Sequence, residues 1–448
     1  MKHQLRSRLT LAATASGRAL SSRRSSVLAS GDPSWSRRSR FCPAVLLLIV
    51  GVAIYTYGGP IEASASTGSP ARHPESISFP TSSLGFALSI RDCKNQTCVG
   101  LQRSDDSGAT WTSLPVPVDL ARFMRMDSWA AYPTYFASGS LTVHFADARD
   151  GWIYGVTPAP VTSTTTNPNF AAQLWSTHDG GASWKKISLS SLGIDYGVVQ
   201  MATHDAVTYL YGASFTTGHA RILSTLSVED RWTSATRSSL RLPAGGTQLQ
   251  GSFTFSGNRG WFVGGNDRGI ISLERLTPTG TWTKWQVRTL ALGEGFAPVT
   301  AESSNDLIVV TSESGWIIPA PKIAPSGWEH GATWLFVSTN AGKTFRAIHE
   351  VANSSRVIFP FENGLPAVTK PGTILLEREQ GTNATTFQLV ASTNSGRSWH
   401  VVIGQRVLQV AVAATSVGYA IVTNNSDPRL SGLHKTTDGG LQWSNVAL

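Results

Sequence analysis

The chain has little cysteine and little charge, and each shortage excludes a class of protein. Three cysteines in 448 residues are too few for a disulfide-stapled miniprotein, and 42 glycines are too few for a collagen. Charged residues make up only 15% of the chain and hydrophobic residues 41%, which excludes a disordered chain. Glycine is abundant together with 15 tryptophans, and this composition favours β-structure.

The net charge of +9 comes almost entirely from the first 40 residues. That tail holds nine of the 37 basic residues and only one of the 28 acidic residues, Asp32. The other 408 residues therefore carry 28 basic and 27 acidic side chains. A body so evenly balanced has no electrostatic footprint for a polyanion, so we expect no nucleic-acid partner.

One long uncharged apolar run follows the tail, at residues 41–57. It is long enough to span a bilayer as a single transmembrane helix, and the arginines at 37, 38 and 40 before it predict a cytoplasmic N-terminus. The sequence Ala63-Ser64-Ala65 leaves open a signal peptide cleaved near Ala65, which would give a secreted protein. Both alternatives export the rest of the chain. The expected organisation is a basic cytoplasmic tail at 1–40, a cell-membrane anchor at 41–57, a flexible linker at 58–76 and a folded domain at 77–448.

Two of the cysteines, Cys93 and Cys98, are separated by four residues. This spacing suits a disulfide in a small hairpin loop, formed in an oxidising compartment. The pair could instead be half of a zinc site, but no second Cys pair and no nearby His pair completes such a site. The sequence therefore predicts a disulfide, with no metal and no cofactor.

An eight-residue pattern, Ser/Thr-x-Asp/Asn-x-Gly-x-x-Trp/Phe, occurs five times beyond the linker. We call the copies turn units; they are residues 104–111, 177–184, 338–345, 392–399 and 436–443. Asp or Asn can hydrogen-bond the backbone that follows it, Gly accepts a positive φ, and the aromatic ring begins the return strand. Each unit should therefore join two antiparallel strands, and its defining residues should be structural. They are Asp106, Gly108, Trp111, Asp179, Gly181, Trp184, Asn340, Gly342, Phe345, Asn394, Gly396, Trp399, Asp438, Gly440 and Trp443.

Two degenerate units, ending at Trp232 and Trp282, fill the gap in this series. The seven aromatic positions are then 44 to 73 residues apart, which is the size of a four-stranded propeller blade. A second landmark, Gly before an aromatic residue, precedes the units and marks the second strand of a blade. It is clear at Gly85-Phe86, Gly151-Trp152, Gly260-Trp261 and Gly418-Tyr419, with looser versions near Tyr209, Leu307 and Leu365. The sequence predicts an all-β fold, a seven-bladed β-propeller of four-stranded blades behind one N-terminal transmembrane helix.

The turn units resemble the Asp-box, or bacterial neuraminidase repeat. Their pairing with Gly-aromatic turns resembles the photosystem II stability/assembly factor-like propellers, over about residues 77–448. This resemblance implies a propeller fold. It implies little about activity, because the Asp-box recurs in sialidases, other glycosidases, sortilin-type receptors and assembly factors.

A sialidase-like glycoside hydrolase is the enzymatic alternative. For that class the resemblance implies an Arg triad, an early Arg-Ile-Pro motif, an Asp acid and a Tyr/Glu nucleophile pair. The first blade has no Arg-Ile-Pro, and the nearest fragment is Arg221-Ile222-Leu223. Glu313, Glu329 and Glu362 are candidate acids in loops, but solvated loop charges are the simpler interpretation. The sequence therefore identifies no catalytic residue and favours a non-enzymatic protein.

Long loops on a rigid scaffold are where binding usually resides. The loops expected between the second and third strands of a blade, or between blades, share one face of a propeller. The long ones are Cys93–Cys98, Pro115–Ser140, Thr157–Ala171, Pro319–Gly331 and Lys370–Asn383. Pro115–Ser140 has the Arg and aromatic content of an interface core, although it could also pack as a cover over the first two blades. The predicted partner-binding residues are Arg122, Phe123, Arg125, Trp129, Tyr132, Tyr135 and, in another loop, Trp328.

These observations predict a single-pass membrane protein with an extracytoplasmic propeller. Its expected function is non-enzymatic binding of an unknown protein or envelope glycan, as a scaffold or assembly factor. A cell-surface receptor or adhesin-like module is a further alternative.

Overall fold

The computed structural model describes part of the chain, in segments. These are residues 72–93, 96–120, 122–124, 141–158, 170–194, 197–213, 220–235, 251–256, 259–265, 270–276, 282–289, 296–304, 307–314, 333–348, 367–370, 373–380, 386–414, 416–423 and 431–448. The chain divides into two units, Met1–Ser66 and Thr67–Leu448, and every described residue belongs to the second. The predicted tail and the predicted transmembrane helix at 41–57 thus lie outside the described residues. Within the segments given above, no helix has the length and apolar character needed to cross a bilayer.

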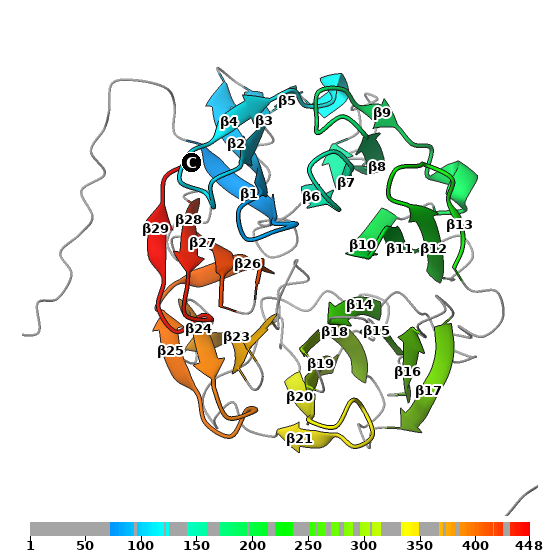
Figure 1. Ribbon diagram of the computed structural model, residues 1–448, viewed down its shortest axis with the longest axis vertical. Coiled ribbons are helices and arrows are strands. Elements are labelled where there is room, and N and C mark those ends of the chain that lie inside the picture. Colours follow the sequence, from blue (N-terminus) through cyan, green and yellow to red (C-terminus); the bar gives the residue numbers. More distant parts are fainter. Residues whose placement is uncertain are drawn as a thin grey trace, which may run out of the picture. The chain divides into compact units, whose positions relative to one another are not determined.

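Seven antiparallel sheets follow one another along the chain, and Figure 1 shows them around a ring. In each sheet four consecutive strands are hydrogen-bonded in chain order, so that hairpins join them. This confirms the predicted seven-bladed β-propeller of four-stranded blades. We number the blades 1 to 7 and letter the strands of each blade a to d, starting from the innermost.

The bounds of the strands follow the predicted spacing. Blade 1 contains β1 (His73–Ser78), β2 (Gly85–Cys93), β3 (Gln96–Ser104), β4 (Thr112–Leu114) and an extra strand, β5 (Arg122–Met124). Blade 2 contains β6 (Leu141–Phe145), β7 (Gly151–Pro158), β8 (Phe170–Thr177) and β9 (Lys185–Lys186). Blade 3 contains β10 (Gly197–His204), β11 (Val207–Ala213), β12 (Ala220–Leu226) and β13 (Thr233–Ser234).

The remaining blades repeat the same order. Blade 4 contains β14 (Gly251–Ser256), β15 (Arg259–Gly265), β16 (Ile270–Leu276) and β17 (Trp282–Thr289). Blade 5 contains β18 (Phe296–Ser304), β19 (Leu307–Ser314), β20 (Thr333–Ser338) and β21 (Arg346–Ile348). Blade 6 contains β22 (Ala367–Lys370), β23 (Thr373–Gln380), β24 (Thr386–Ser392) and β25 (His400–Ile403). Blade 7 contains β26 (Arg406–Val412), β27 (Gly418–Thr423), β28 (Ser431–Thr436) and β29 (Ser444–Val446). Two short 3-10 helices, η1 (Val118–Leu120) and η3 (Ser190–Leu192), lie between strands.

The turn units lie between strands c and d in each blade that has one, including the degenerate copies that end at Trp232 and Trp282. They therefore lie, with the a–b turns, on one side of the ring, which we call the turn face. The b strands end and the c strands begin on the opposite side, which we call the loop face.

Side-chain hydrogen bonds fix the shape of the five full turn units. In blade 1 the Gly108 N–H donates to Ser104 Oγ over 2.8 Å, and the Thr110 N–H donates to Asp106 Oδ1 over 2.8 Å. The Thr110 hydroxyl also donates to Asp106 Oδ2 over 2.6 Å. Ser107 and Gly108 have φ values of 63° and 82°, so the turn needs two consecutive residues in the left-handed region. These bonds stay within eight residues, which is why the pattern can be recognised in the sequence.

The same bonds predict an acid-sensitive fold. They hold the pKa of Asp106 at about 2, below its ordinary 3.8, chiefly through the hydroxyl of Thr110, and Ser183 does the same for Asp179. Because the folded-state pKa is lowered, this stabilisation is present above the ordinary pKa of 3.8 and is lost as the pH falls towards about 2. We expect the double variant Asp106→Asn/Asp179→Asn to lose less stability than the natural chain as the pH falls from about 4 to about 2, as followed by circular dichroism. At neutral pH it should match the natural chain, because Asn340 and Asn394 make the same turn in blades 5 and 6. An unchanged acid transition would contradict this account.

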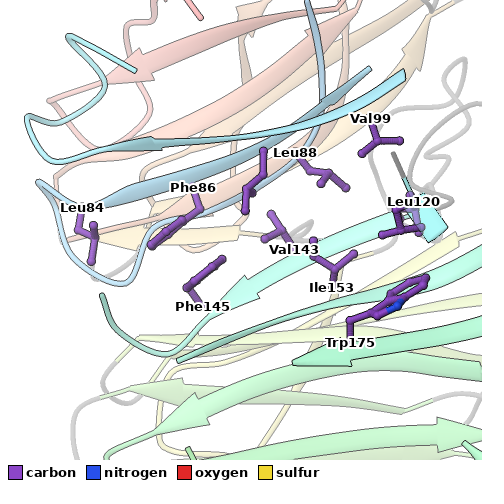
Figure 2. Packing of buried hydrophobic residues seen from close by; sticks show 11 residues of the cluster. Leu84, Phe86, Leu88, Val99, Leu120, Val143, Phe145, Ile153 and Trp175 are labelled. Carbon is purple, nitrogen blue, oxygen red and sulfur yellow. The ribbon is translucent and has the colours of Figure 1, made fainter. Parts of the chain in front are cut away.

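An aromatic wedge between blades explains the Gly-aromatic landmark. Phe145 at the end of β6 stacks on Phe86 of blade 1, with ring centroids 3.5 Å apart, and meets Trp184 edge-on at 6.3 Å. Figure 2 shows the facing rings of Phe86 and Phe145. A Cβ on Gly151 would lie 2.5 Å from the Phe145 ring, so only glycine fits beneath it. Phe79 repeats the arrangement over Gly85, where it stacks on Tyr419 of blade 7 at 3.5 Å.

Blades 7 and 1 close the ring without exchanging a strand, since all strands of blade 7 come from the C-terminal end. The blue and red ends of the propeller lie side by side in Figure 1. Gln409 on β26 accepts the Ile77 N–H over 2.8 Å and donates to the Ile77 carbonyl over 2.9 Å. Tyr419 and Lys435 each donate to the Ser107 carbonyl over 3.0 Å. The closure is therefore made by side chains and an apolar cluster, in place of backbone pairing.

Two predicted boundaries differ from the structure. Strand β1 begins at His73, ahead of the domain start expected at 77. The segment Lys370–Asn383 was predicted as a loop, and this was wrong, because strand β23 occupies Thr373–Gln380. The looser landmark predicted the second strand of blade 6 near Leu365, whereas that strand, β23, begins at Thr373. The buried Ile374, Leu375 and Leu376 explain the difference, since a run of adjacent apolar residues fits a strand that is covered on both sides.

Candidate functional site

The first part of the predicted binding loop, Pro115–Ser140, belongs to blade 1. Strand β4 pairs with the Leu101–Arg103 end of β3, and β5 pairs with its Gln96–Cys98 end. The helix η1 connects β4 to β5, so residues 112–124 form one interrupted outer edge that runs to the loop face. Arg122 and Phe123 are therefore strand residues and not loop residues as predicted.

Several contacts hold the later part of this edge, residues 115–124, which we call the segment root. Leu120 is fully buried in the cluster between blades 1 and 2, where Figure 2 shows it beside Trp175. The Trp184 indole N–H donates to the Pro115 carbonyl over 3.0 Å, and Lys186 Nζ lies 3.1 Å from Asp119 Oδ2. Between these anchors, Val118 is 91% exposed. The root is thus a fixed element that presents an apolar side chain to solvent.

The other predicted binding residues, Arg125, Trp129, Tyr132, Tyr135 and Trp328, lie outside the described residues. The structure thus places Arg122 and Phe123 on a strand, and the partner-binding role of all seven residues stays a prediction.

Cys98 lies on β3 and is disulfide-bonded. Its predicted partner, Cys93, ends the neighbouring strand β2, where it pairs with Gln96 while Cys98 pairs with Arg91. The two cysteines are therefore diagonal neighbours across the β2–β3 hairpin, and their pairing with each other stays a prediction.

The described acids differ from those singled out in the sequence. Glu313 lies in strand β19 and not in a loop, while Glu329 and Glu362 lie outside the described residues. Glu377 on β23 was missed: it is fully buried, and its Oε1 accepts the Val407 N–H over 2.8 Å between blades 6 and 7. Its Oε2 has no hydrogen-bond partner among the described residues. Nothing in its sequence context separates Glu377 from the exposed acids, because its burial depends on the next blade.

Glu377 should make the stability of the protein fall as the pH rises. Burial raises the pKa of Glu377 from its ordinary 4.5 to about 7, although Arg406 opposes the shift. With a raised folded-state pKa, the stabilisation is complete below the ordinary pKa of 4.5 and is lost as the pH rises through about 7. Over this interval the slope can reach about 1.4 kcal/mol per pH unit.

We expect Glu377→Gln to remove this slope, which urea unfolding at a series of pH values between about 5 and about 8 will measure. The half-buried Glu229→Gln is the matched control and should leave the slope in place. Equal slopes for Glu377→Gln and the natural chain would contradict the assignment.

A polar cluster joins the turn units of blades 2 and 3. His178 Nδ1 lies 2.8 Å from Asp150 Oδ1, and His178 Nε2 lies 3.4 Å from Asp230 Oδ1. Burial raises the pKa of Asp150, and the hydrogen bond from His178 opposes that shift. Asp230 also accepts from Ser176 and Lys185, so the cluster acts as a link between blades. No group of described residues has the composition and spacing to hold a metal ion.

A cavity of about 420 Å³ lies on the turn face between blades 5 and 6. Its walls come from two turn units and from the residues immediately before and after the first of them. They are Val337, Thr339, Thr344, Phe345, Arg346, Asn394, Ser395 and Arg397. Sequence reasoning assigned only structural roles to these turns and missed the cavity, because its walls come from two different blades.

The fold and these sites define the chain as a β-propeller with a candidate binding surface on each face. No protein-family model matches the sequence, and no curated protein matches it. Among solved structures, the chain is similar to YCF48 bound to a D1 peptide, with 14% identity, 80% of this chain and 90% of that chain covered, and a TM-score of 0.46. It is also similar to a polysaccharide lyase, the PL25 ulvan lyase, with 10% identity, coverages of 84% and 96%, and a TM-score of 0.47.

A third similar structure is the Trypanosoma rangeli sialidase in complex with the inhibitor DANA. Its identity is 11%, the coverages are 83% of this chain and 56% of that chain, and the TM-score is 0.35. These proteins share a fold and differ in what they do, so the similarities assign no activity.

Proposed function

We propose that the protein is a membrane-anchored, extracytoplasmic propeller of the Asp-box type that binds a protein partner or envelope glycan through its loop face. The apolar run at 41–57 would hold it in the membrane with its basic tail in the cytoplasm. Binding would use the segment that leaves blade 1 after β5 and contains Arg125, Trp129, Tyr132 and Tyr135.

The segment root carries this proposal. A binding loop needs a rigid base, because a base that is already ordered lowers the entropy cost of ordering the interface. The buried Leu120, the β3–β5 pairing and the bond from Trp184 supply that base. Val118, 91% exposed between these anchors, supplies apolar surface at the same edge.

Glycan hydrolysis is the alternative proposal, and the described residues do not favour it. Glu377 has the raised pKa expected of a general acid, but its side chain is fully buried between two blades and cannot reach a substrate.

Crosslinked co-purification from membranes tests the binding proposal. The test variant lacks residues 126–139 and keeps the segment root, because deleting Leu120 would damage the core. A variant shortened by the same length in the basic tail, at residues 10–23, is the control. We expect a partner captured by the natural chain and by the control to be lost with the 126–139 deletion, while circular dichroism stays unchanged. Recovery of the same partners from all three proteins would contradict the proposal.

A further inference from the structure

The cavity between blades 5 and 6 differs in charge from the other turn units. At the third position blades 5 and 6 have Asn340 and Asn394, whereas the units of blades 1, 2 and 7 have Asp106, Asp179 and Asp438. At the sixth position they have Lys343 and Arg397, where the other three units have Ala109, Ala182 and Leu441. These changes remove negative charge from the turns of two neighbouring blades and add positive charge there.

The change from Asp to Asn leaves the turn intact. Asn340 Oδ1 accepts the Thr344 N–H over 2.9 Å, and Asn394 Oδ1 accepts the Ser398 N–H over 2.9 Å. Asp106 accepts the equivalent N–H of Thr110 over 2.8 Å. Since the turn forms equally well with either residue, folding alone does not require the neutral amide.

The amide also reverses a hydrogen bond at the cavity wall. In blade 1 the Thr110 hydroxyl donates its proton to Asp106, so that proton is used within the turn. In blade 5 the Asn340 amide donates to the Thr344 hydroxyl over 2.7 Å, which leaves the hydroxyl proton to point elsewhere. Thr344 lines the cavity, so this proton is a donor for a bound acceptor.

Two arginines add further donors. Arg346 Nη2 donates to the Ser395 carbonyl over 2.7 Å, a bond that reaches from blade 5 to blade 6 and holds the guanidinium across the cavity. Arg397, on blade 6, also lines the cavity and is exposed. None of the described residues that line the cavity is acidic. By contrast, Arg103 of blade 1 is neutralised by Asp105 at 2.8 Å.

The cavity also has an apolar side and the volume of a small ligand. Phe345, half-buried, stands where the other full units have Trp, and both Phe345 and Val337 line the cavity. A cavity of about 420 Å³ falls within the range of small-molecule sites. A planar guanidinium fork matches a carboxylate, and an aromatic ring next to hydroxyl groups matches the face and edge of a sugar ring.

We propose that the turn-face cavity between blades 5 and 6 binds a small carboxylated saccharide, whose carboxylate contacts Arg346 and Arg397 and whose ring packs on Phe345. This site is separate from the loop-face binding proposed above, and either can fail without the other.

Ligand-observed NMR titration of the purified full-length chain with methyl glucuronide tests the proposal. Methyl glucoside is the neutral match, and inorganic phosphate and a triglutamate peptide are the other anions. We expect the glucuronide to bind, the glucoside to bind at least about tenfold more weakly, and affinity to fall with added salt. Phosphate or the peptide binding at the same arginines as tightly as the glucuronide would overturn the assignment to a saccharide.

Three variants locate the site. Arg346→Gln and Arg397→Gln should each weaken glucuronide binding by about tenfold or more, because each removes charged hydrogen bonds to the carboxylate. Asn340→Asp should also weaken glucuronide binding, because the aspartate adds negative charge and accepts the hydroxyl proton of Thr344. The turn itself should still fold, since Asp occupies this position in blades 1, 2 and 7. Arg149→Gln, an exposed arginine on the turn face outside the cavity, should leave binding unchanged. No binding of the glucuronide, or equal binding by all four variants, would overturn the proposal.

Discussion

We expect Phe145→Ala to lower the free energy of unfolding by about 3–5 kcal/mol, the usual cost of removing a buried aromatic ring. Phe145 is 2% exposed, and its ring fills the space between Phe86, Trp184 and the backbone of Gly151. Gly151 has no side chain that could fill the space, so a cavity should remain between blades 1 and 2.

Urea unfolding followed by tryptophan fluorescence will measure this loss. Val118→Ala, at a 91% exposed position, is the control and should change stability by no more than about 0.5 kcal/mol. If Phe145→Ala costs no more than the control, the aromatic wedge does not hold these blades together.

The second large effect concerns the closure of the ring. We expect Gln409→Leu to destabilise the fold by about 2–4 kcal/mol, because it leaves two buried backbone groups of Ile77 without partners. Gln200→Leu should have a similar cost, since Gln200 makes the same pair of bonds to Phe253 between blades 3 and 4.

Gln442→Leu is the matched control, because Gln442 is exposed and its side chain makes no hydrogen bond to the described residues. Chemical unfolding at neutral pH gives the comparison, and hydrogen exchange shows where the ring opens. We expect faster exchange at the blade 7–blade 1 junction in Gln409→Leu and at the blade 3–blade 4 junction in Gln200→Leu. Exchange rates that stay at natural values at both junctions would contradict the assigned role of these glutamines.

Local hydrogen bonding explains why so much of the fold could be predicted. The bonds that the Gly108 and Thr110 N–H groups donate to Ser104 and Asp106 span four residues, and each is specified by residue types at fixed positions. The glycine of the Gly-aromatic landmark was read correctly as a marker of strand b. Its physical reason, the ring of Phe145 lying on Gly151, became visible only in the structure.

The errors and omissions have a different origin. The start of the segment Pro115–Ser140 reads as a loop because it is interrupted by prolines at 115 and 117 and by a helical turn. It is a strand edge because β3 is longer than β4, so that the backbone of Gln96–Cys98 pairs with β5. Pairing with a distant strand leaves no periodic signal in three residues.

Residue types at fixed spacings predicted the number of blades, the order of the strands within a blade and the position of the full turn units, because each such turn is held by hydrogen bonds within eight residues. How the ring closes, where Glu377 is buried and that two turn units form a cavity became visible only once the blades were packed together. The bond that closes the ring joins Ile77 to Gln409, which are 332 residues apart. Contacts of that kind depend on how completed blades meet, and no local pattern encodes them.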